Sequence, residues 1–157
     1  VRPGASPTEI CSSSGAWVMS TIDSAGTVGA YTSIAISSTD APYISYYDAG
    51  ANKNLKYAYY SGGAWTTATI DSTDNVGGFT SIKLNSVDNV YVSYYDFTRA
   101  DLKMATNFSG AWVTETVDGS GAGNNVGMFN SLDLDSLEVP HISYFDDANK
   151  DLKYAHQ

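Results

Sequence analysis

Apolar and polar positions alternate with a period of two in parts of the chain, which is typical of β-strands with two distinct faces. Near residue 80, for example, Ile82 and Leu84 flank polar Lys83. The segment 90–96 instead carries β-branched and aromatic residues at most positions, which predicts a strand covered on both faces. No stretch keeps apolar residues at helical spacing, so we expect an all-β chain of about a dozen strands.

The same series of strands recurs three times along the chain. Each copy opens with Gly-Ala-Trp, passes through a tyrosine-rich run that ends in aspartate, and closes with Leu-Lys-(Tyr/Met)-Ala. A period of roughly 50 residues with several short strands per unit is typical of β-propeller blades. We therefore divide the chain into a flexible leader, 1–14, and three propeller-type repeats, 15–60, 63–107 and 110–157.

The order of strands in the repeats predicts how the chain assembles. The chain opens with what reads as a fourth strand, 17–22, and closes with a third strand, 152–156, so the last of three four-stranded antiparallel blades lacks its outer strand. Propellers close with four or more blades, and an open edge invites pairing. We expect a homodimer that closes as six blades, each N-terminal strand completing the partner's last blade. An open strand-donated assembly and a fragment of a longer propeller are the alternatives.

The charge and composition of the chain limit the kinds of molecule that it can bind. The net charge is −9, from 8 basic and 17 acidic residues, which argues against nucleic acid because phosphate binding needs clustered cations. Neutral sugars or cations fit better. No apolar run approaches the roughly 20 residues that cross a bilayer, so we expect no membrane insertion. The single cysteine, Cys11, lies before the first repeat and is either a free thiol or a bridge to another chain.

The repeated motif has counterparts in known proteins. The pattern GAW…TID…TS…P-x-ISYYD…LKYA, over residues 15–156, resembles an uncharacterised family of secreted bacterial and archaeal propeller-type repeat proteins. That resemblance implies blade architecture and an extracellular or cell-surface location. More distantly, a Gly-rich hairpin followed by a Trp that opens the next strand is similar to propeller lectins assembled from short chains, which bind sugars at blade interfaces.

The recurring aromatic and charged residues are the candidates for ligand binding. Tryptophan offers a flat face that stacks on a sugar ring, although each could instead pack between blades. An aspartate ends each second strand and a lysine follows on the third, so we expect the two to pair across the hairpin, either structurally or facing a ligand. The candidates are Trp17, Trp65, Trp112, Asp48, Asp96, Asp146, Lys56, Lys103 and Lys153.

Metal and catalytic motifs are sparse. Asp71 and Asp74 could place oxygens around Ca²⁺, but aspartates in such loops also bond their own backbone, so no cofactor is expected beyond this calcium possibility. The sequence has no nucleophile elbow, metal cluster or catalytic cysteine. Only the pair Asp133 and Asp135 suggests a hydrolase.

Three functions follow from these observations. The first is a non-enzymatic extracellular recognition module that binds carbohydrate weakly and multivalently, as lectins do. The second is a structural or adhesive surface component built by strand-exchanged self-assembly. The third is a propeller glycosidase, which would need acids in the central channel.

Overall fold

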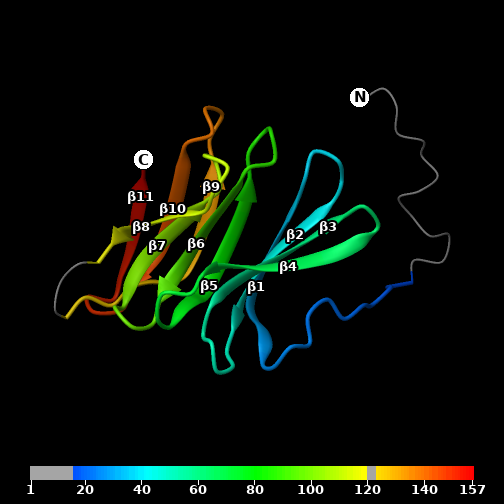
Figure 1. The fold of residues 1–157 in the computed structure, drawn as a ribbon. Helices are drawn as coiled ribbons and strands as arrows, with labels where there is room; N and C mark the ends of the chain where they lie inside the picture. Colours follow the sequence, from blue (N-terminus) through cyan, green and yellow to red (C-terminus); the bar gives the residue numbers. More distant parts are fainter. Residues whose placement is uncertain (1–15, 120–122) are drawn as a thin grey trace.

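The chain folds into three antiparallel β-sheets that lie side by side (Figure 1). The computed structural model describes residues 16–119 and 123–157, so the predictions for the leader, 1–14, and for Cys11 lie outside the described residues. No described element is a helix, and none could therefore cross a membrane as one. The strands are β1 (Val28–Ile36), β2 (Pro42–Asp48), β3 (Leu55–Ser61), β4 (Ala64–Asp71), β5 (Val76–Leu84), β6 (Val90–Asp96), β7 (Asp101–Thr106), β8 (Val113–Asp118), β9 (Val126–Leu134), β10 (Pro140–Asp146) and β11 (Asp151–His156).

Each sheet is built from consecutive strands. The first sheet has the order β1-β2-β3-β4, the second β5-β6-β7-β8, and the third β9-β10-β11, with antiparallel pairing throughout. The prediction of an all-β chain with three sets of strands is confirmed, and within the described residues the last set is one strand short. A sheet and a sequence repeat are offset by one strand, because β4 and β8 open the next repeat.

Residues 17–22 form no strand within the single chain, so the prediction that they complete a partner's last blade stays a prediction. This segment leads into β1 without pairing with any described strand, and Trp17 is 92% exposed. A strand needs a neighbouring edge to satisfy its backbone groups. The third sheet, which has three strands among the described residues, lies at the opposite end of the molecule from this segment (Figure 1).

The first strands of the sheets hold neighbouring sheets together. β5 lies between β1 and β9 and packs against both. It begins with an irregular register around Gly77, whose φ is +109°. A Cβ on Gly77 would lie 2.8 Å from the Cα of Leu55 on β3, and one on Gly127 would lie 2.7 Å from the Cα of Leu102 on β7. The missing side chain therefore lets one sheet rest on the backbone of the preceding one.

The apolar core lies between the sheets. One buried cluster fills the junction of the first and second sheets, and another fills the junction of the second and third; we call these the first and second junctions. Leu55 and Leu102 are fully buried there, whereas Leu152, at the same position in the third sheet, is 86% exposed. The sequence of the third sheet is equally apolar, but no described sheet follows to cover it.

Replacing Gly77 with alanine tests this close approach. The Gly77→Ala variant should lose about 3 kcal/mol of unfolding free energy, because the new Cβ meets backbone at a positive φ. The matched control is Gly110→Ala, with a φ of +87° and no atom within 4 Å of the added Cβ, which should cost about 1 kcal/mol. Equal urea midpoints for the two variants would contradict the packing role.

Candidate functional site: the junctions between sheets

In each of the three sheets, a tyrosine and a lysine contact an aspartate that precedes the sheet in the sequence. Asp71, at the end of β4, reaches the second sheet, where its Oδ2 accepts hydrogen bonds from Tyr94 Oη at 2.7 Å and Lys103 Nζ at 2.8 Å. All three side chains are buried. We call this arrangement the Asp-Tyr-Lys triad. The other two triads are Asp23 with Tyr46 and Lys56, and Asp118 with Tyr144 and Lys153.

The triads shift the pKa values of their members. The hydrogen bond from Lys56, with further bonds from Ala25 N–H and Tyr46, lowers the pKa of Asp23 to about 2. Burial alone would raise the pKa of Asp71, but the bonds from Lys103 and Tyr94 outweigh it and lower this pKa below its ordinary value. Each triad is therefore held with its carboxylate ionised at neutral pH.

The lysines pair with a different set of aspartates from the one expected. Lys103 lies opposite Tyr94 in the β6–β7 register and contacts Asp71, not Asp96. The Asp96 carboxylate instead accepts two N–H bonds from its own turn and an ion pair from Arg99. Asp48 and Asp146 likewise accept bonds from their turns, and only in the third sheet does a lysine, Lys153, also come within 4.0 Å of such an aspartate.

The three tryptophans occupy different environments. Trp112 is half-buried and packs edge-on against Tyr57 of the first sheet, with ring centroids 5.2 Å apart. It therefore spans the first junction. Trp65 is also half-buried but contacts Tyr60 within its own sheet, and Trp17 faces solvent.

Half-buried rings line the first sheet beside Trp112. Tyr59 stacks on Tyr43 at 5.7 Å and on Tyr57 at 5.4 Å. We call Tyr43, Tyr59 and Tyr57 the aromatic ladder. Burial, followed by the nearby Asp88 of the second sheet, raises the pKa of Tyr43. The third sheet has a counterpart ladder, in which His156 stacks on His141 at 5.7 Å and on Tyr154 at 5.5 Å.

The aromatic ladder could not be predicted from the sequence, because only some of its residues recur in the other repeats. His141 and Tyr91 stand where Tyr43 stands, but Tyr59 is replaced by Thr106 and His156 in the other repeats. The triads left a clearer trace, since all three of their members recur in every repeat.

The candidate metal and catalytic carboxylates have protein partners. Asp71 belongs to a triad and Asp74 binds Arg99 at 2.9 Å. Asp133 pairs with Lys83 at 3.2 Å, and Asp135 accepts N–H bonds within its turn and lies 3.5 Å from His141. Across residues 16–119 and 123–157, no three His, Cys, Asp or Glu side chains gather as a metal site would require.

The fold has a counterpart among solved structures. No protein-family model matches the chain, and no curated protein is similar to it in sequence. A fucose lectin from Kordia zhangzhouensis, solved in complex with methyl-fucoside, has a similar fold, with a TM-score of 0.53 at 12% sequence identity. The similarity covers 80% of this chain and 91% of the lectin chain. At this identity the similarity concerns the fold alone, and it agrees with a propeller-like arrangement of the three sheets.

Neutralising Asp71 should destabilise the protein. Asp71→Asn leaves Lys103 buried beside an uncharged group, and we expect a loss of about 3 kcal/mol. Asp74→Asn is the matched control, because it breaks only an exposed ion pair with Arg99 and should cost about 0.5 kcal/mol. Chemical denaturation at pH 7 measures both. A loss for Asp71→Asn no larger than that of Asp74→Asn would refute the role of the triad.

Acid should weaken all three triads. The folded pKa values of Asp23, Asp71 and Asp118 are lower than the ordinary 3.8. Their stabilisation is therefore complete above about pH 5 and is lost as the pH falls through the folded values, the value for Asp23 being about 2. Urea midpoints measured from pH 5 down to pH 2 should fall steadily below pH 4. A flat profile over that range would be incompatible with ionised triads.

Proposed function

We propose that this protein is a non-enzymatic extracellular recognition module that binds carbohydrate weakly at several positions, as a six-bladed propeller made of two chains. The observation that supports this function best is the fold it shares with a lectin solved with methyl-fucoside bound. The aromatic ladder at the first junction offers what a sugar site needs, and for this reason we place the first site there.

The ladder combines flat rings with polar groups. The Tyr43 and Tyr59 rings are half-buried, which fixes their orientation and leaves part of each ring accessible. Ser38 and Asp88 bond to each other across the same junction and supply hydroxyl and carboxylate groups close to Tyr43. Sugars bind to such combinations through stacking on an apolar ring face and hydrogen bonds at its rim.

Several weak sites would act together. The counterpart ladder of the third sheet, His141 with Tyr154 and His156, is a second position of the same kind. Two chains would carry both ladders twice. Linked weak sites gain avidity on a surface that presents many copies of a glycan.

A structural or adhesive surface component is the second candidate. The observation in its favour is the open edge of β11, next to which Leu152 is exposed. Such an edge can recruit a strand from another chain, and repeated donation would build a filament. A glycosidase has less support, because Asp133 and Asp135 are held by Lys83 and by turn N–H groups.

Sugar binding should raise the stability of the protein. We expect methyl-fucoside, or another monosaccharide from a panel, to add about 2.7 kcal/mol of unfolding free energy at one hundred times its Kd. Tyr59→Ala should abolish most of this gain, because it removes the central ring of the ladder. Phe108→Ala, which removes an exposed ring from a turn, is the control and should keep it.

Two negative results together would rule out carbohydrate recognition. If no sugar in the panel raises the melting temperature, and a glycan array shows no binding, carbohydrate recognition is excluded. The structural role would then be preferred.

A further inference from the structure

We propose that a second copy of this chain completes both ends of the three sheets through one kind of contact, made twice in the pair. In this contact, residues 17–22 of one copy form the missing outer strand beside β11 of the other, and Leu152 of that other copy packs against Gly29 of the first. We call the contact between the third sheet of one copy and the first sheet of the other the closing junction. The inference rests on the proposed two-chain propeller and identifies the residues that build it.

The first sheet has a vacant position for a leucine. At the second junction Leu102 is buried among Val126, Ile142 and Tyr144 and lies beneath Gly127. The equivalent residues of the first sheet are Val28, Ile44, Tyr46 and Gly29, and together they line a pocket of about 230 Å³. No described atom lies within 4 Å of a Cβ added to Gly29. Leu152, the third leucine of the series, is 86% exposed in the single chain.

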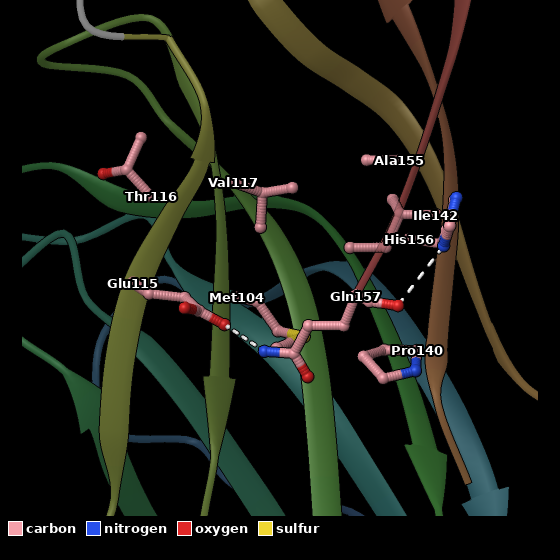
Figure 2. Close-up of a pocket in the computed structure, with 9 residues that line it drawn as sticks. All are labelled: Met104, Glu115, Thr116, Val117, Pro140, Ile142, Ala155, His156 and Gln157. Atoms are coloured by element: carbon pink, nitrogen blue, oxygen red, sulfur yellow. Dashed lines mark hydrogen bonds between the residues drawn. The ribbon is translucent and has the colours of Figure 1, made fainter. Parts of the chain in front are cut away.

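The second junction has a vacant position for a tryptophan. At the first junction Trp112 packs against Tyr57 and the cluster that contains Val90, Val92 and Ala105. The equivalent residues at the second junction line a pocket of about 210 Å³ between β8 and β11 (Figure 2). Those residues are Met104, Pro140, Ile142 and Ala155. Trp17 is the tryptophan missing from this position, and it is 92% exposed in the single chain.

Polar groups also match across the closing junction. At the first junction Asp88 accepts two hydrogen bonds from Ser38, and at the second Glu138 accepts one from the Ser86 N–H. The residues at the equivalent positions of the closing junction are Asp40, which is exposed, and Ser136. The acidic residue of the first sheet therefore lies where the serine turn of the partner's third sheet would reach it.

Two positions that are joined by a hydrogen bond at the other junctions both carry different residues at the closing junction. At both junctions within the chain a tyrosine hydroxyl donates to an asparagine Oδ1 at 2.6 Å. The pairs are Tyr47 with Asn75 and Tyr95 with Asn125. At the closing junction the equivalent residues are Phe145 and Thr27. The hydroxyl and its amide acceptor are both absent, so neither is left buried without the other.

The donated strand is already anchored on the correct side. Asp23 completes a triad with Tyr46 and Lys56 of its own first sheet, just as Asp71 and Asp118 do from the outer strands of the preceding sheets. Residues 17–22 thus approach the first sheet as an outer strand of a preceding sheet would. The β7–β8 register, transferred to β11, places Ser20 opposite Tyr154 and Val18 opposite His156.

Two copies are the smallest number that closes a ring. Three sheets per chain give six blades from two copies, within the four to eight that propellers use. Each copy then donates one strand and receives one, so no sheet edge of this kind stays open. The closing junction is made twice in the pair, and two linked contacts hold the copies together more tightly than either contact would alone.

Cross-linking tests the register directly. The 157-residue chain carrying Ser20→Cys and Tyr154→Cys, with its one cysteine removed by Cys11→Ser, should form disulfides between chains. A non-reducing gel should show a covalent pair and no larger species, and each single-cysteine variant should remain uncross-linked. Uncross-linked chains, a disulfide within one chain, or a ladder of higher bands would each overturn the closed pair.

Matched variants test the two vacant positions. Light scattering should give twice the 16.7 kDa chain mass for the unmodified chain. Trp17→Ala should weaken this association about thirtyfold, whereas Phe108→Ala, also an exposed aromatic residue, should leave it unchanged. Association of Trp17→Ala at the unmodified strength would overturn the proposal.

A glycine pair keeps the test valid if Trp17→Ala does not fold. Gly29 and Gly26 have φ values of +95° and +94°, and neither has a described atom near an added Cβ. Gly29→Ala should give a folded single chain and Gly26→Ala a pair, because only Gly29 meets the partner's Leu152. Equal masses for the two variants would count against the closing junction.

Sugar binding separates this proposal from the proposed function. The aromatic ladder and Trp112 of the first junction lie within one chain, so Gly29→Ala should keep its sugar response while losing the pair. A sugar response with no pair would reject the closing junction alone, and a pair with no sugar response would reject carbohydrate recognition alone.

Discussion

The contact between neighbouring sheets is the interaction on which the rest of the structure depends. A four-stranded sheet of this chain has two apolar faces, and each face is buried only where a neighbouring sheet packs against it. Gly77 and Gly127 allow the backbones to approach, and Leu55 and Leu102 fill the space beneath them. Where a described neighbour is missing, the same leucine at position 152 is exposed. Stability therefore resides in the junctions rather than in the individual sheets.

The junctions also gather the polar and aromatic chemistry of the molecule. Each holds one Asp-Tyr-Lys triad that connects an outer strand to the sheet that follows; its lysine–carboxylate contact is buried at the first junction and partly exposed at the second. The aromatic ladder and Trp112 converge at the first junction. A ligand that stacks on these rings would contact residues from two sheets, so proposed recognition and assembly depend on the same surfaces.

The repeat made much of the fold predictable. Alternating residues identified the strands, and the threefold recurrence identified the three sheets, the last of which has three strands among the described residues. The contacts of the lysines were not predictable in the same way. Alternation assigns Lys103 to a face of its strand, but it does not reveal that Asp71, from the preceding sheet, reaches that face. The strand predicted at 17–22 does not form within the single chain, because a strand needs a neighbouring edge to pair with.

The most direct test of this account is amide hydrogen exchange at residues 18–22 and 152–156, measured at high and low protein concentration. If a second copy pairs these segments, both should be protected at high concentration and both should lose protection on dilution, while β6 in the central sheet stays protected throughout. Rapid exchange of both segments at every concentration would contradict the closing junction, and with it the view that this chain is half of a ring.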